Sequence, residues 1–144
     1  MPPSAVVDAS VLVSAFLFPG SLPGQVLKLA GQGRFALHLS PILLDETRDA
    51  LLLPRLRNAY GYDEEAVLAW CAELREIGTV FRGLLPDIGR VCRDPDDDHV
   101  IAAALAAGAG AIVTGDKDLL ALGCYQTVRI LAVRAFLAEI APDA

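Results

Sequence analysis

Short runs of apolar residues alternate along this chain with longer stretches in which apolar positions recur every three or four residues. The short runs predict buried β-strands at residues 5–7, 34–39, 79–81, 111–114 and 128–131. The longer stretches predict α-helices at residues 9–17, 21–33, 41–53, 63–78, 98–107 and 133–140, with a further short helix after residue 116. This alternation indicates an α/β fold with a parallel sheet covered on both faces.

Residues at the ends of these stretches support the predicted boundaries. Ser21, Ser40 and Asp63 are typical helix N-caps, because their side-chain oxygens accept hydrogen bonds from free backbone N–H groups. Pro54 is expected to end the helix that begins after Ser40, and Gly78 to end the helix that follows Asp63. We find no linker or repeat, and therefore predict one domain over residues 1–144, with three layers and about five strands.

Length and composition exclude several classes of protein. The chain has 144 residues, of which 54% are hydrophobic, so it can bury a sizeable core. Its longest apolar run, Val100 to Val113, has 14 residues, fewer than the roughly 18–20 that a membrane-spanning helix needs. Three scattered cysteines and two histidines provide neither a zinc ribbon, nor a disulfide framework, nor a multi-histidine metal site. We expect a cytoplasmic protein without a membrane span.

Two of the predicted strands end in a carboxylate. Asp8 follows the first strand directly, and Asp116 follows the strand at residues 111–114. Ligands of open α/β sheets bind beyond the carboxyl ends of the strands, where both residues would lie. Each aspartate alone is also explained as a helix N-cap, but two strands that end in the same way favour a shared site.

A third group of acids begins the Ala-rich helix, where residues 94–98 contain four aspartates. The positive end of the helix dipole accounts for one or two of them, but four would repel one another. A hard divalent cation such as Mg²⁺ or Mn²⁺ removes this repulsion by binding carboxylate oxygens. Because apolar residues follow Asp98, we expect it to point at the sheet edge and the others to face solvent or the loop.

Two further polar residues have two interpretations each. Glu46 lies at the margin of the apolar face of the predicted 41–53 helix, either as a site residue or as an ordinary boundary residue. Ser10 follows Asp8 by two residues. It either orients a carboxylate or a water molecule, or is merely a small residue in the first turn of a helix.

These residues fall in four segments that, in order and spacing, resemble the PIN domain. The segments are Val-Val-Asp8-Ala-Ser10, Ser40-Pro41-x-x-Leu-x-Glu46, Arg93-Asp94-Pro-Asp-Asp-Asp98 and Ile-Val-Thr114-Gly-Asp116-Lys-Asp118-Leu-Leu. PIN domains are an α/β/α family of metal-dependent ribonucleases that includes the toxins of VapC-type toxin–antitoxin pairs. The resemblance therefore implies an endoribonuclease for single-stranded RNA.

The resemblance also implies roles for individual residues. Asp8, Glu46, Asp98 and Asp116 correspond to the four acids of the family, and Ser10 corresponds to its neighbouring hydroxyl. The same four acids, together with Asp118, are then expected to bind Mg²⁺ or Mn²⁺. An antitoxin protein as partner and a homodimer are further implications.

The charge of the chain bears on RNA as a substrate. The formal net charge is −6 and the pI is about 4.7, which disfavours binding of a polyanion. Without the five carboxylates assigned to the site, however, 13 acids face 12 bases, and ten of these bases are arginines. The arginines nearest the site in sequence either contact the RNA backbone or cover apolar neighbours: Arg48, Arg55, Arg57 and Arg93.

Two other functions compete with this interpretation. A phosphatase of the haloacid-dehalogenase type also has an Asp at the end of its first strand, but needs a second acid two residues later, where this chain has Ser10. A non-catalytic module would use its leucine-rich helices and Trp70 to bind a partner protein. Metal-dependent RNA cleavage would separate this module from the nuclease.

Overall fold

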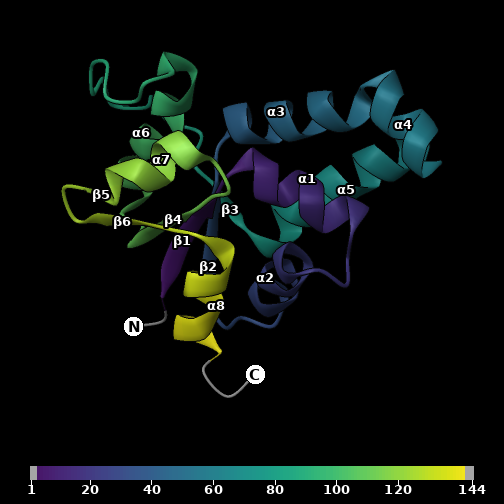
Figure 1. Ribbon diagram of the computed structural model, residues 1–144, viewed down its shortest axis with the longest axis horizontal. Helices are drawn as coiled ribbons and strands as arrows, with labels where there is room; N and C mark the ends of the chain where they lie inside the picture. Colours follow the sequence, from purple (N-terminus) through teal and green to yellow (C-terminus); the bar gives the residue numbers. More distant parts are fainter. Residues whose placement is uncertain (1–2, 142–144) are drawn as a thin grey trace.

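The computed structural model describes residues 3–141, and its strands form one six-stranded sheet (Figure 1). Their order across the sheet is β3-β2-β1-β4-β6-β5, and all neighbours are parallel except β5 and β6. The strands are β1 (Ser4–Val7), β2 (Ala36–Leu39), β3 (Thr79–Val80), β4 (Ala111–Val113), β5 (Cys124–Tyr125) and β6 (Val128–Leu131). The predicted α/β fold is confirmed, with six strands instead of about five because the short β5 was not predicted.

The helices also follow the predicted order, with one addition. They are α1 (Ala9–Leu17), α2 (Leu22–Gly31), α3 (Pro41–Leu52), α4 (Pro54–Tyr60), α5 (Glu64–Ile77), α6 (Asp98–Ala107), α7 (Lys117–Leu122) and α8 (Val133–Ile140). A 3₁₀ turn over Pro95–Asp97 precedes α6. The addition is α4, which begins at the proline expected to be a helix breaker. Proline is tolerated in the first turn, so Pro54 ends α3 and begins α4.

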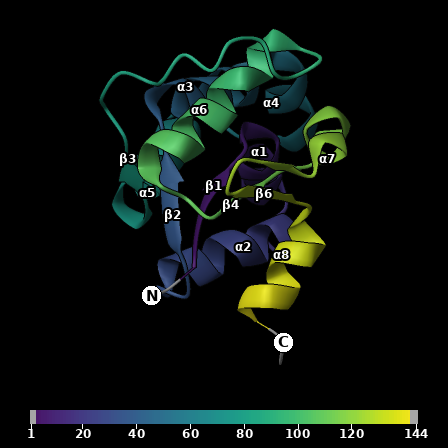
Figure 2. The ribbon, with the colours of Figure 1, turned by 90° about the vertical axis from the view of Figure 1, so that its left-hand side faces the viewer.

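The core is divided by the sheet, because successive residues of a strand point to opposite faces. From β1, Ala5 and Val7 join the cluster formed with α1, α2, α5 and α8, whereas Val6 joins the cluster formed with α6 and α7. Figures 1 and 2 show α2 and α6 on opposite sides of these strands. Both faces of the sheet are therefore covered, as the uninterrupted apolar runs predicted.

The two central strands bring the predicted site residues together. In the parallel pairing of β1 with β4, Val7 lies opposite Val113. The residues that follow, Asp8 and Thr114, consequently leave the sheet side by side at the same edge. The backbone N–H of Asp8 donates to the carbonyl of Val113 at 2.9 Å, which extends the pairing to the site.

Among residues 3–141, no single helix is long and apolar enough to cross a membrane. Helices α1 and α2 together reach the required length and hydropathy, but their axes meet at 98°. Their buried residues contribute to the core described above.

Candidate active site

Asp8 is held from two sides at the end of β1. Its Oδ1 accepts a hydrogen bond from the backbone N–H of Ala9 at 2.8 Å, so it is the N-cap of α1. Its Oδ2 accepts a 2.7 Å hydrogen bond from the hydroxyl of Thr114 and a 3.5 Å hydrogen bond from that of Ser10. Asp8 as a whole residue is 8% exposed. Asp8 thus caps a helix and also belongs to the cluster of polar groups beyond β1 and β4.

Thr114 is the residue that connects the two strand ends. Its side chain is fully buried, and its hydroxyl both donates to Asp8 and accepts the backbone N–H of Asp116 at 3.0 Å. Sequence reasoning placed Thr114 in the family pattern without assigning it a role. Predicting the role of Thr114 would have required the β1–β4 register, which sets Thr114 beside Asp8.

Asp116 begins α7 as its N-cap. Its Oδ1 accepts a hydrogen bond from the backbone N–H of Asp118 at 2.7 Å. The contact between these two residues is therefore between a carboxylate and a backbone amide. Asp118 therefore lies in the first turn of α7, within the same loop as Asp116, as its position in sequence required.

Asp97 is the acid that faces Asp116. Partial burial, a hydrogen bond with Asp116 and the negative charges of Asp116, Asp94 and Asp8 raise the pKa of Asp97 to about 7. The raised pKa favours the protonated form of the Asp97 carboxyl, because its ionisation would add a further negative charge beside Asp116. Asp97, Asp116 and Asp8 consequently form one electrostatic cluster, which we call the acid cluster.

Asp98, which the sequence predicts to point at the sheet edge, is bound to backbone amides of the preceding loop. Its carboxylate accepts the backbone N–H of Cys92 at 2.6 Å and that of Val91 at 3.3 Å. Partial burial opposes its ionisation, but these hydrogen bonds and the charge of Arg90 hold the pKa of Asp98 below its ordinary value. Asp98 therefore anchors the preceding loop to the start of α6.

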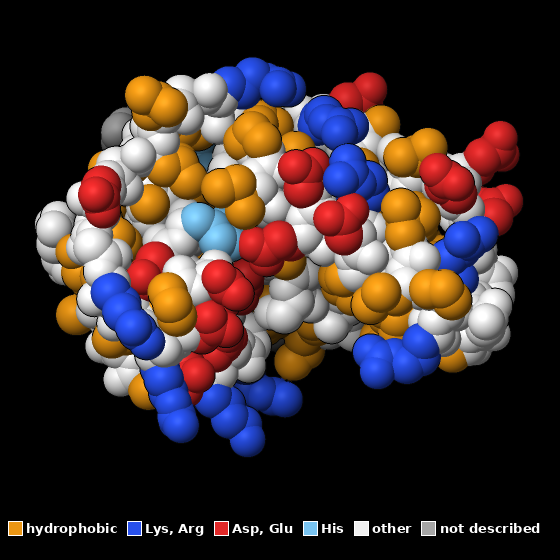
Figure 3. All heavy atoms as spheres, turned by 90° about the horizontal axis from the view of Figure 1, so that it is seen from above, with side chains coloured by type: hydrophobic (Ala, Val, Ile, Leu, Met, Phe, Trp, Pro, Cys, Tyr) orange, Lys and Arg blue, Asp and Glu red, His pale blue; other side chains and the backbone are white. Residues whose placement is uncertain are grey.

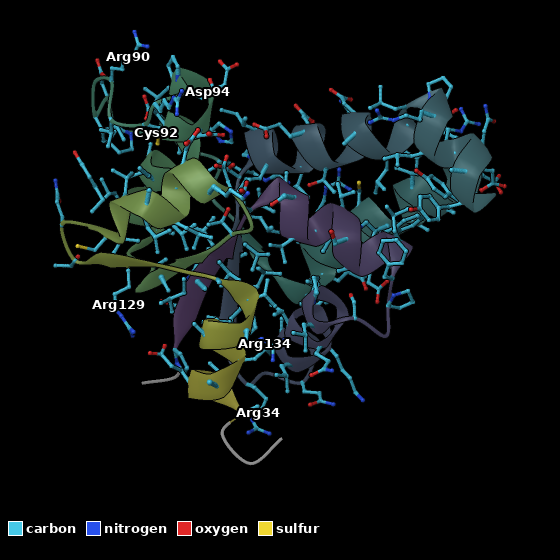
Figure 4. All side chains as sticks on the ribbon, in the orientation of Figure 1. Arg34, Arg90, Cys92, Asp94, Arg129 and Arg134 are labelled. Atoms are coloured by element: carbon cyan, nitrogen blue, oxygen red, sulfur yellow. The ribbon has the colours of Figure 1, made fainter. Side chains whose placement is uncertain are left out.

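The 3₁₀ turn explains why Asp97 and Asp98 have different neighbours. Each residue of a helical turn rotates the side-chain direction by about 100–120°, so neighbouring aspartates face different sides. Of the other acids in this segment, Asp94 caps the turn by accepting the backbone N–H of Asp96 at 3.0 Å, and both are exposed. Figure 4 labels Arg90, Cys92 and Asp94 on this loop, at the top of the molecule.

Glu46 contacts α6 through a histidine side chain. Its Oε1 contacts Nε2 of His99, the residue after Asp98. The Glu46 side chain is 45% exposed and the His99 side chain 14%, so the pair sits where α3 borders α6 at the surface. Sequence reasoning did not identify His99 as the partner of Glu46, because nothing local links α3 to α6.

The surface around these residues carries both charges. Viewed from above, acidic side chains form a band beside a histidine, and Lys or Arg side chains project at one end of that band (Figure 3). Among the arginines that were expected to contact RNA, Arg48 forms salt bridges with Asp49 at 3.0 Å and with Asp45 at 3.3 Å. These neighbours raise the pKa of Arg48, so its guanidinium is paired with acids of its own helix, α3.

The acid cluster fits a divalent cation in its chemistry but is not arranged as a finished site. Within residues 3–141, no group of three His, Cys, Asp or Glu side chains is close enough to hold an ion together. The oxygen donors of Asp8, Asp97 and Asp116 are nevertheless the type that Mg²⁺ and Mn²⁺ prefer. Burial and then the neighbouring carboxylates raise the pKa of Asp97, and a cation would neutralise the negative charge that these carboxylates add.

Three comparisons with known proteins bear on this site. A family model described as "PIN domain" matches residues 4–118, a range that includes the whole acid cluster. The uncharacterized protein MJ1680 of Methanocaldococcus jannaschii is 33% identical over 118 residues, which are 81% of this chain and 73% of that protein. The crystal structure of PAE2754 from Pyrobaculum aerophilum has a TM-score of 0.61 at 20% identity, covering 98% of this chain and 91% of the other, which shows a shared fold.

Proposed function

Because the chain belongs to the PIN domain family, whose members are generally nucleases, we propose that it is a metal-dependent endoribonuclease that cleaves single-stranded RNA. One observation carries the proposal: the buried hydroxyl of Thr114 bonds both Asp8 Oδ2 and the backbone N–H of Asp116, so these two acids lie together at the carboxyl ends of β1 and β4. This is the edge at which open α/β sheets bind their ligands.

Three residues would hold the cation, and others would keep them in place. Asp8, Asp97 and Asp116 would bind Mg²⁺ or Mn²⁺, whose charge attracts the phosphate and stabilises the transition state. Thr114 keeps Asp8 and Asp116 in a constant relation to each other, since its hydroxyl is bonded to both. With a cation in place, Asp97 would be held in its ionised form, because the ion would offset the repulsion between the neighbouring carboxylates.

Glu46 and Ser10 are assigned to the attacking water in this proposal. The Glu46 carboxylate is half exposed and oriented by its contact with His99, so it can accept a proton from a water at the border of the site. The Ser10 hydroxyl lies 3.5 Å from Asp8 Oδ2 and can hydrogen-bond the same water. In this proposal both groups bind or deprotonate the attacking water, and neither contacts the phosphate.

Exposed arginines are the proposed contacts to the RNA backbone. Arg90 and Arg93 are exposed residues of the loop that Asp98 anchors, and Arg55 is an exposed residue of α4. Guanidinium groups bind phosphate in two-point contacts, which suits this task. Arginine–phosphate contacts release counterions from the RNA, so we expect binding to weaken as the salt concentration increases.

The cellular context is part of the same proposal. The four sequence segments resemble the PIN domain, a family that includes VapC-type toxins, and this resemblance supports a toxin that acts in the cytoplasm as a homodimer and is neutralised by an antitoxin protein. Growth arrest on expression, relieved by co-expression of the adjacent gene, would support this role. Normal growth with an active nuclease would instead indicate a ribonuclease without toxicity.

The activity is tested with purified protein and a mixed single-stranded RNA in Mn²⁺. We expect cleavage that EDTA abolishes and that Asp8→Asn lowers by about a hundredfold or more. Asp45→Asn is the matched control, because Asp45 is an exposed acid of α3 whose side chain is 61% exposed and pairs with Arg48. Full cleavage by Asp8→Asn, or cleavage in EDTA, would contradict the proposal.

A further inference from the structure

A groove lies between α2 and α8, far from the acid cluster. It encloses about 610 Å³, and Leu22, Leu29 and Leu137 provide its apolar surface. Figure 4 shows the labelled Arg34 and Arg134 at this end of the molecule and Asp94 at the opposite end. The groove is therefore separate from the residues of the proposed nuclease.

The charge of the groove is opposite to that of the chain. Both ionisable side chains that line it, Lys28 and Arg134, are cationic and exposed, although acids outnumber bases by 18 to 12 in the whole sequence. Glu139, the acid of α8, is bound to Arg129 at 2.6 Å and is not among the lining residues. The guanidinium of Arg34 donates to the carbonyl of Ile140 at 3.4 Å, which adds a third cation at the end of α8.

The lining also distinguishes between classes of ligand. Single-stranded nucleic acids bind on aromatic side chains that stack with bases, and none of the nine residues that line the groove is aromatic. A row of leucines with cations on both sides instead matches a helix that carries apolar residues on one face and carboxylates beside them. The supporting helices have ten and eight residues, so the groove has room for about two to three turns.

We propose that this groove binds an acidic amphipathic helix of a partner protein. Leucine-type side chains of that helix would contact Leu22, Leu29 and Leu137, and its carboxylates would pair with Lys28 and Arg134. The proposal does not depend on the nuclease function, because the groove and the acid cluster share no residue.

A fluorescein-labelled peptide of about three turns provides the probe, with leucines at helical spacing and glutamate at the other positions. Fluorescence anisotropy should show saturable binding that weakens with salt. We expect Lys28→Glu and Arg134→Glu each to weaken binding by about tenfold. Arg75→Glu, which makes the same charge change at an exposed position of α5, should leave binding unchanged.

Two more peptides and one more variant test specificity. A peptide of equal composition without the leucine stripe should bind at least about tenfold more weakly, and a lysine-for-glutamate peptide should bind Arg134→Glu better than wild type. RNA cleavage by Arg134→Glu should equal that of wild type, which keeps this test apart from that of the nuclease. Circular dichroism verifies that the variants are folded.

Several results would overturn the proposal. These are no saturable binding of the stripe peptide, equal binding of the peptide without a stripe, or an equal loss with Arg75→Glu. Light scattering on the protein alone supplies a further test. A mass that doubles with concentration in wild type but not in Arg134→Glu would assign the groove to a second copy of this chain and not to a partner helix.

Discussion

The hydroxyl of Thr114 donates a 2.7 Å hydrogen bond to Asp8 Oδ2 and so joins the ends of two neighbouring strands through a fully buried side chain. The same hydroxyl accepts the backbone N–H of Asp116. Two acids that are 108 positions apart in the chain are thereby oriented by one oxygen atom. Thr114 thus fixes the positions of Asp8 and Asp116 relative to each other within the acid cluster.

Thr114→Val tests this connection, because valine has nearly the same shape but no hydroxyl. The buried Asp8 Oδ2 and the N–H of Asp116 would each lose a partner, so we expect the free energy of unfolding to fall by ~1–3 kcal/mol. RNA cleavage should fall with it. Thr114→Ser keeps the hydroxyl and should stay much closer to wild type. Urea unfolding measures both variants, and a valine variant as stable as wild type would contradict the assignment.

Asp97 predicts a pH dependence of stability. Its pKa of about 7 in the folded protein exceeds the ordinary value of 3.8, so the unfolded chain loses this proton first. The stability that the protonated group contributes is complete below about pH 4 and is lost as pH rises through about 7. In EDTA, Asp97→Asn should therefore gain stability relative to wild type as pH rises, reaching ~1–2 kcal/mol at pH 8 after solvent screening.

Unfolding by urea at pH 5 and pH 8 measures this difference. Asp96→Asn is the control, because Asp96 is an exposed acid of the same turn. It should show no comparable change between the two pH values. If Asp97→Asn and wild type differed by the same amount at both pH values, Asp97 would not have a raised pKa in the folded protein.

Asp98 is predicted to matter for the loop more than for the chemistry. Asp98→Ala removes the acceptor for the N–H groups of Val91 and Cys92, so we expect a loss of ~1–3 kcal/mol in the free energy of unfolding. Hydrogen exchange at these two amides should accelerate. For cleavage, Asp98→Asn should retain more activity than Asp97→Asn. If Asp98→Asn instead lost more cleavage activity than Asp97→Asn, Asp98 and not Asp97 would be the acid that faces the substrate.

The three free cysteines should differ in reactivity. Burial, a hydrogen bond with Asp98 and nearby carboxylates raise the pKa of the Cys92 thiol to about 12, and burial also raises that of Cys71. The thiolate is the reactive form of cysteine. At pH 8, iodoacetamide should therefore label the exposed Cys124 at least about a hundredfold faster than the buried Cys71 and Cys92. Mass spectrometry of timed samples measures this. Equal labelling of Cys92 in the folded protein would contradict its placement.

Local features of the chain predicted most of the fold. Ser21, Ser40 and Asp63 are N-caps as expected, since a cap depends on a side chain and the backbone two or three residues later. Helix α4 was missed because Pro54 is compatible both with a helix end and with a helix start. Strand β5 has two residues, Cys124 and Tyr125, and is defined by its pairing with β6 more than by its own pattern.

The candidate site was predicted in part. Asp8 and Asp116 lie at the same edge of the sheet, because both follow apolar strands and the strands are parallel. Asp97 was passed over in favour of Asp98, since the apolar residues after Asp98 do not reveal how the 3₁₀ turn rotates the chain. His99 and Thr114 could not be assigned at all, because their partners are distant in sequence.

The sequence by itself determined which residues form strands, where the helices begin and which carboxylates follow the strand ends, because these properties depend on near neighbours in the chain. Only the tertiary structure decided which of them meet. The β1–β4 register sets Thr114 beside Asp8, and the turn before α6 directs Asp97 to Asp116 and Asp98 to Cys92. If the β1–β4 register or the turn before α6 were shifted by one residue, a different side chain would point toward the site.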